Sequence, residues 1–170
     1  MLPAIIIVVA VLGVLLSSFQ KEAGMGAPRK GGVATTAAAT EAEALASGTG
    51  ASGYDAFSKS LTVAVVAARN MPVSTAAEFR LQVALTNTFD CLAASREAWQ
   101  AQVEDEWDPA LDGSPDLWRT AHPALTESPP GSRVGNADGA AGAPLTSEQV
   151  RAWARSSADL WLQKAVDLAG

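Results

Sequence analysis

The feature that most constrains this chain is an uninterrupted apolar segment near its N-terminus. Residues 2–19 read LPAIIIVVAVLGVLLSSF and carry no charged side chain. As a helix, a segment of this length would extend about 27 Å, close to the roughly 30 Å hydrocarbon core of a bilayer. The segment also has no His, Asn or Gln, so it offers no ligand for an ion or a proton. We therefore expect residues 2–19 to form a single-pass transmembrane anchor.

The alternative interpretation of this segment is a cleaved signal peptide. Signal peptides have a cationic start, an apolar run of about 7–15 residues and small residues at the cleavage site. Here no Lys or Arg precedes a longer run. Cleavage would release a secreted or periplasmic helical binding protein. If the anchor is retained, Lys21, Arg29 and Lys30 follow it, and this excess of positive charge favours a cytoplasmic location for the rest of the chain.

The next segment, residues 20–52, consists mostly of small residues. It is rich in Gly, Ala, Ser and Thr, and no aromatic residue lies between Phe19 and Tyr54. Such a sequence has little apolar area with which to offset the conformational entropy lost on folding. We expect residues 20–52 to be a flexible tether.

Residues 53–170 show the apolar spacing of amphipathic helices. The periodicity and the turn residues predict helices over about 54–69, 76–106, 115–121 and 146–169. Three pairs have the spacing of N-terminal capping boxes: Ser52 with Asp55, Thr75 with Glu78, and Thr146 with Gln149. The predicted fold is all-α: a small three-helix bundle with a long Pro/Gly-rich loop, containing the short helix 115–121, before the last helix.

The charge balance and the scarcity of Cys and His exclude several classes of function. The chain has 170 residues, 12 Lys and Arg, 18 Asp and Glu, and a net charge of −6. Nucleic-acid binding requires clustered cations, which are lacking here. With one Cys and one His, the chain cannot form an internal disulfide or a Cys-based zinc site.

Carboxylates recur every seven residues on the predicted helix 76–106, at Asp90, Glu97 and Glu104. Paired carboxylates can bind a divalent cation or catalyse proton transfer. A helical wheel places this acidic ridge opposite Leu92 and away from the core, which favours a solvated face.

The following run, DPALDGSPD, resembles the start of a calcium loop, with Asp108, Asp112 and Gly113 at ligand and turn positions. It lacks carboxylates at two required positions, Ala110 and Arg119. We expect no metal site in this loop.

Cys91 and His122 could in principle act as a nucleophile and its base. Cys91 falls near the apolar border of its helix, where a free Cys is usually a small buried hydrophobe. No third group that would orient the His is apparent, and no nucleotide-binding, hydrolase or metalloprotease motif is present. We therefore expect no catalytic residues and no cofactor. An enzyme that uses Cys91 or the acidic ridge is the least favoured hypothesis.

The last predicted helix is apolar over more than half of its circumference, so it packs on two sides or binds a partner. The sequence predicts a protein-interaction surface on this helix, formed by Trp153, Leu160, Trp161, Leu162 and Val166. Trp99, Trp107, Trp118 and Trp161 are expected to pack together where three helices meet. The predicted function is that of a non-catalytic, membrane-anchored subunit or adaptor of a protein complex, with no small-molecule ligand indicated.

Overall fold

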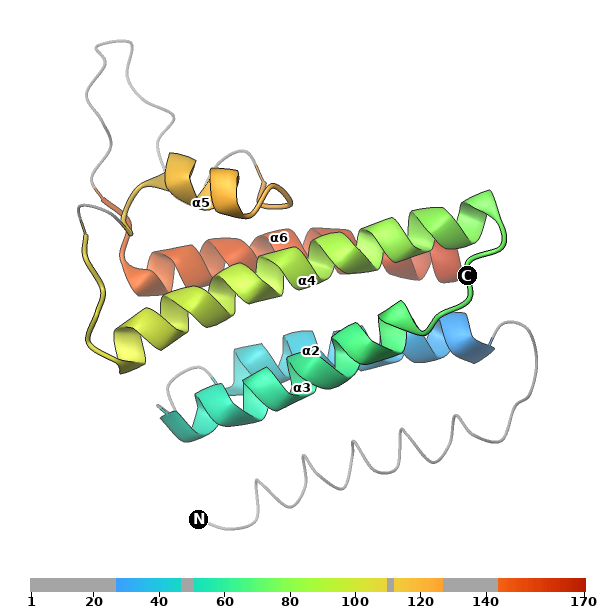
Figure 1. Ribbon diagram of the computed structural model, residues 1–170, viewed down its shortest axis with the longest axis horizontal. Helices are drawn as coiled ribbons and strands as arrows, with labels where there is room; N and C mark the ends of the chain where they lie inside the picture. The colour runs from blue at the N-terminus through green and yellow to red at the C-terminus, as the bar shows by residue number, and fades with distance from the viewer. Residues whose placement is uncertain (1–26, 47–50, 110–111, 127–143) are drawn as a thin grey trace.

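The computed structural model describes residues 27–46, 51–109, 112–126 and 144–170. These residues contain five helices and no strand, so the prediction of an all-α fold is confirmed for them. Four long helices form an antiparallel bundle, in which each helix runs opposite to the one before it (Figure 1). They are α2 (Ala27–Ala46), α3 (Ala51–Arg69), α4 (Ala76–Val103) and α6 (Ser147–Ala169), and the short helix α5 (Pro115–Ala121) precedes α6.

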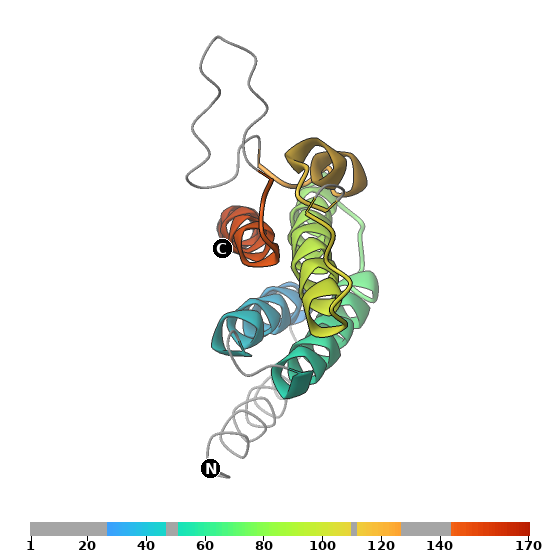
Figure 2. The same ribbon diagram turned by 90° about the vertical axis from the view of Figure 1, so that its left-hand side faces the viewer.

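Viewed along the helices, α2, α3, α4 and α6 occupy the four corners of the bundle in that order (Figure 2). Helices α2 and α3 form one hairpin, and α4 and α6 form the other. Helix α5 lies outside the bundle, over α4 (Figures 1 and 2). This is the up-down-up-down arrangement of four-helix bundles, with α5 in the one long connection.

The expected tether is wrong for residues 27–46, because they form α2, the fourth member of the bundle. The buried face of α2 carries Val33, Thr36, Ala39, Thr40 and Glu43, each of which lies three or four residues from another member of the set. Only two of these residues, Val33 and Ala39, are apolar. The sequence pattern therefore did not indicate an amphipathic helix. The bundle thus has four long helices where three were predicted.

Two threonines of α2 can be buried because their hydroxyls bond within the helix. Thr36 Oγ1 donates to the Gly32 carbonyl at 2.8 Å, and Thr40 Oγ1 donates to the Thr36 carbonyl at 3.1 Å. A buried hydroxyl without such a partner would destabilise the fold. Gly32 lies beside α4, and a Cβ on it would make an ordinary contact with Leu85 Cδ1 at 3.7 Å.

The interior consists of two apolar clusters. The larger one joins all four long helices around Phe57, Leu92, Trp99 and Trp153, all of which are almost fully buried. The smaller one surrounds Leu81 and Leu85 near the α3–α4 turn and includes Val33 and Ala165.

Two of the three expected capping boxes are confirmed. Thr75 caps α4 and Thr146 caps α6, each with its partner side chain bonded back to the backbone. The third prediction is wrong, because α3 begins at Ala51 and Ser52 therefore lies inside the helix.

Helix α4 ends at Val103, earlier than the expected residue 106, through a Schellman motif. Asp105 adopts a positive φ of 57°. Glu106 N–H donates to the Ala101 carbonyl at 2.8 Å, and Asp105 N–H donates to the Gln102 carbonyl at 3.4 Å. This pair of bonds satisfies carbonyls that the helix would leave unpaired. Aspartate tolerates the left-handed conformation better than most residues.

None of the helices in the described residues is long and apolar enough to cross a membrane. The predicted anchor 2–19, and residues 110–111 and 127–143 of the Pro/Gly-rich loop before α6, lie outside the described residues.

Candidate functional site

His122 does not form a nucleophile–base pair with Cys91. Both of its ring nitrogens face carboxylates: Nδ1 lies 3.1 Å from Asp90 Oδ1, and Nε2 lies 3.1 Å from Glu97 Oε2. Cys91 is fully buried, and burial raises the pKa of its thiol to about 12. A thiol in that state is a poor nucleophile at neutral pH.

We call Asp90, Glu97 and His122 the outer cluster. Ionised carboxylates only accept hydrogen bonds, so both contacts form at once when both ring nitrogens carry a hydrogen. Asp90 also accepts from the Ala124 backbone N–H at 3.0 Å, and the His122 ring stacks on Trp118. The cluster fastens the segment that contains α5 to the outside of α4. The acidic ridge therefore points away from the core as expected, but part of it is covered by this segment.

A second polar cluster, which sequence reasoning missed, lies inside the bundle. Glu43 of α2 is fully buried. Its Oε1 accepts from Ser95 Oγ at 2.7 Å and from Arg151 at 3.1 Å, and its Oε2 lies 3.3 Å from Arg155 Nε. We call Glu43, Ser95, Arg151 and Arg155 the inner cluster. It joins α2, α4 and α6 with side chains distant in the sequence, so no local pattern could have revealed it.

The guanidinium of Arg151 contacts both the Glu43 carboxylate and the Trp99 ring. Its Cζ lies 3.8 Å from the centre of the Trp99 ring, in cation–π geometry. Burial lowers the pKa of Arg151, and the charge of Glu43 opposes that shift. The inner cluster thus pairs a buried carboxylate with arginines, and it joins three helices of the bundle.

Asp112 and Gly113 of the candidate calcium loop both contact other residues of the same loop. Asp112 accepts a hydrogen bond from the Asp108 backbone N–H at 2.8 Å. Gly113 is needed for packing, because a Cβ there would lie 2.3 Å from the Pro109 carbonyl oxygen. No group of three or more potential metal ligands occurs among the residues that the structure describes.

The predicted interaction residues of α6 have different environments. Trp153 is fully buried in the core, and its indole N–H donates to Thr126, so it presents no surface to a partner. Leu160 and Val166 are 61% and 44% exposed. Trp161 and Leu162 are half-buried.

The four tryptophans predicted to meet all contact the larger core cluster. Trp107 and Trp118 stack with ring centres 6.3 Å apart, whereas Trp99 stacks on Phe57. The indole N–H of Trp161 donates to the Ala124 carbonyl at 2.9 Å.

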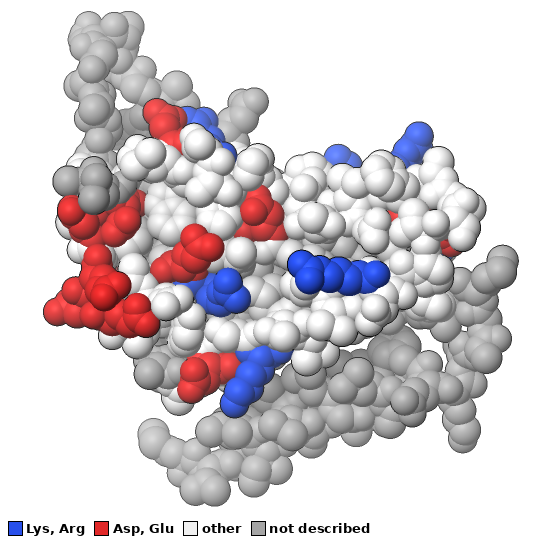
Figure 3. All heavy atoms as spheres, viewed as in Figure 1, with Lys and Arg blue, Asp and Glu red and all other residues white. Residues whose placement is uncertain are grey.

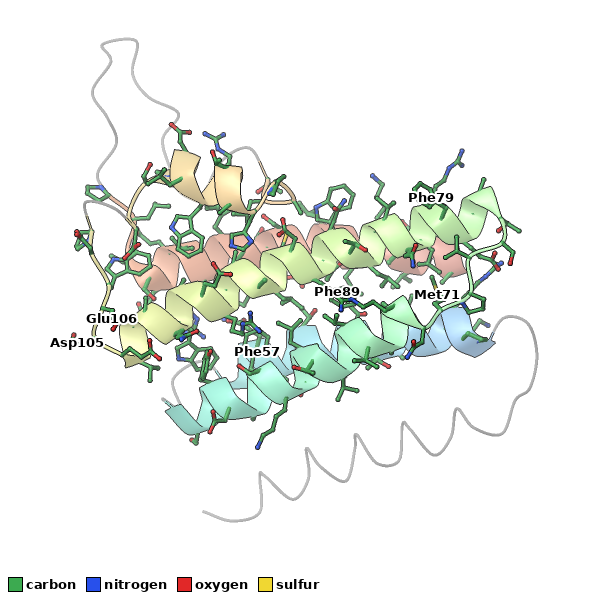
Figure 4. All side chains as sticks on the ribbon, viewed as in Figure 1. Phe57, Met71, Phe79, Phe89, Asp105 and Glu106 are labelled. Carbon is green, nitrogen blue, oxygen red and sulfur yellow. The ribbon has the colours of Figure 1, made fainter. Side chains whose placement is uncertain are left out.

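An open groove of about 490 Å³ runs between α3 and α4. Its apolar lining includes Leu61, Val65, Val66 and Phe89, and Phe89 projects from α4 toward α3 (Figure 4). Polar lining residues include Arg69, Asp90 and Arg96. Figure 3 shows Lys and Arg side chains along the boundary between the two helices. We call this the α3–α4 groove.

A second groove of about 490 Å³ lies between the start of α4 and the end of α6. We call it the α4–α6 groove. It is lined by two basic residues, one acidic residue and apolar side chains: Phe79, Arg80, Val83, Ala84, Trp161, Lys164, Asp167 and Leu168.

Comparison of the chain with known protein families, curated proteins and solved structures finds no match.

Proposed function

We propose that this protein is a non-catalytic, membrane-anchored adaptor or complex subunit whose helical bundle binds a partner protein in the α3–α4 groove. The anchor would be residues 2–19, with the bundle on the cytoplasmic side. The single observation that carries the proposal is the groove itself, an open apolar depression along two helices. The engaged nitrogens of His122 and the buried thiol of Cys91 support a role without catalysis.

The lining of the groove indicates the chemistry of the partner. Its floor is apolar, and Val66 on this floor is 52% exposed. Two of its polar lining residues are Arg69 and Arg96, against one acid, Asp90. The complementary ligand is an amphipathic helix with apolar residues on one face and Asp or Glu beside them.

A pair of valines on α3 allows a matched test. A photo-crosslinking residue replaces Val66, which lines the groove, or Val63, which is 41% exposed on the same helix but does not line it. Each full-length variant is expressed and irradiated in membranes of its native host. We expect a discrete protein product from position 66 that is absent from position 63.

Charge reversal then tests the partner's chemistry. Arg69→Glu combined with Arg96→Glu should abolish the product from position 66 while the bundle stays folded by circular dichroism. Identical products from positions 66 and 63, or a product insensitive to charge reversal, would contradict the proposed groove.

The anchor is tested separately by intact mass and an alkaline wash of the membrane fraction. A full-length mass in the washed pellet supports the anchor. A soluble chain that lacks the apolar segment would instead establish the secreted or periplasmic alternative.

A further inference from the structure

The two ends of the bundle differ in charge. One end holds the start of α2, the α3–α4 turn and the end of α6 (Figure 1). Five cations on these elements, Arg29, Lys30, Arg69, Arg80 and Lys164, outnumber two acids, Asp167 and the Glu78 that pairs with Arg29. We call this the basic end. The opposite end, where α4 terminates, gathers acidic side chains on its surface, including the labelled Asp105 and Glu106 (Figures 3 and 4). The molecule is therefore electrostatically polarised along its long axis.

The α4–α6 groove lies at the basic end and leaves large apolar side chains exposed. Phe79 is 59% exposed and Val83 is 40% exposed. Figure 4 shows Phe79 on the side of α4 away from α3. Leu160, 61% exposed, lies one turn before Lys164 and therefore on the same face of α6.

Cations accompany these apolar side chains. The ammonium of Lys164 lies 4.7 Å from the centre of the Trp161 ring. Arg80 lines the same groove, where Asp167 is the one acid. Aromatic rings beside Lys and Arg suit the boundary between lipid acyl chains and anionic headgroups.

The chain enters the bundle at this same end. Helix α2 begins at Ala27, and seven residues separate it from Phe19, the last residue of the apolar segment. Seven residues reach at most about 25 Å when fully extended. Because α2 takes up most of the expected tether, an anchor at residues 2–19 would hold the basic end close to the bilayer.

From these observations we propose that the α4–α6 groove at the basic end docks on the anionic surface of the bilayer in which residues 2–19 are anchored. The inference rests on the anchor of the proposed function, and it adds a fixed orientation with the acidic end facing away from the membrane. A second copy of the chain is a poorer occupant, because symmetric pairing would place Arg80 and Lys164 close to their own copies.

Two valines of α4 with similar exposure permit a controlled test. Val83 lies in the groove and Val103, 42% exposed, lies at the far end of the same helix. Each is replaced by Cys in the full chain and labelled with an environment-sensitive fluorophore, since the native Cys91 is fully buried. The labelled chains are reconstituted into vesicles of phosphatidylcholine alone or with phosphatidylglycerol in equal parts, containing a lipid-borne quencher.

With phosphatidylglycerol, we expect blue-shifted, quenched emission from position 83 and neither effect at position 103. Both effects should decrease in phosphatidylcholine alone and in the variant Arg80→Glu with Lys164→Glu. Equal signals at the two positions, a blue shift at position 83 without quenching (the mark of self-association), or effects independent of phosphatidylglycerol would overturn the docking.

Sedimentation of the same samples separates failure of the docking from failure of the anchor. A chain that stays with the vesicles after an alkaline wash but shows no quenching at position 83 refutes the docking and leaves the anchor intact. A chain that washes off the vesicles refutes the anchor and, with it, the proposed orientation.

Discussion

The inner and outer clusters both use carboxylates to join segments distant in the sequence, but they differ in access to water. Glu43 has no exposed surface, whereas the side chains of Asp90 and Glu97 are 30% and 51% exposed. An unpaired charge destabilises the fold strongly when it is buried and only slightly when it is exposed to water. The inner cluster should therefore decide whether the bundle assembles, and the outer cluster should decide only whether the α5 segment stays attached.

The largest expected effect comes from Glu43→Leu. This change leaves Arg151 and Arg155 buried or half-buried without their carboxylate, which should lower the free energy of unfolding by about 3–5 kcal/mol. Urea denaturation followed by circular dichroism measures this loss. The control is Glu41→Leu on the exposed face of the same helix, with an expected change within about 0.5 kcal/mol. Equal effects of the two changes would contradict the importance of the inner cluster.

A smaller, local effect is expected from His122→Ala. The loss of both carboxylate contacts and of stacking on Trp118 should cost about 1–2 kcal/mol. Amide hydrogen exchange should accelerate in residues 112–126 and not in α2 or α6. Thr120→Ala, an exposed change on α5, is the control. Faster exchange throughout the bundle would show that the outer cluster also supports the core.

A contrast between local and long-range contacts explains which parts of the fold could be predicted from the sequence. Helices α4 and α6 were predicted because their capping residues and apolar spacing are local signals, and the start of α4 at residue 76 and the extent of α5 were correct. The end of α4 was placed too late because the Schellman motif uses Asp105 in place of glycine.

Helix α2 was missed because its buried face is formed by small and polar residues. Thr36 and Thr40 become compatible with the core only through bonds to carbonyls four residues earlier, and Glu43 only through arginines more than one hundred positions away. The α3–α4 groove was missed for a related reason, since a groove depends on how two helices pack. The carboxylates of the outer cluster were recognised as one ridge, but nothing local connected them to His122.

Glu78 forms an ion pair with Arg29 whose contribution to stability can be followed as a function of pH. Its hydrogen bond from Arg29, with others from the Ser74 and Thr75 backbone, lowers its pKa from 4.5 to about 2. A carboxylate with a lowered folded-state pKa stabilises the fold above its unfolded-state pKa, and this contribution disappears as the pH falls through the folded-state value. The midpoint temperature of the native chain should therefore fall between about pH 4.5 and pH 2.

In Glu78→Gln this part of the decline should be missing, while at neutral pH the variant should be less stable than the native chain. Glu106→Gln, at an exposed position of the acidic end, serves as the control and should keep the native profile. An unchanged acid profile in Glu78→Gln would mean that the ion pair with Arg29 contributes nothing to folding.

The smallest effect should come from Asp116→Asn, which removes a charge from the same short helix that the outer cluster fastens. The Asp116 side chain is 86% exposed and pairs with Arg119 one turn later. Exposed pairs of this kind contribute about 0.5 kcal/mol or less, so urea denaturation should barely distinguish this variant from the native chain. Adding Asp116→Asn to His122→Ala should leave the cost of the His122 change unaltered. A large effect of Asp116→Asn alone would mean that exposure does not govern the strength of these contacts, and the contrast between the two clusters would then need another explanation.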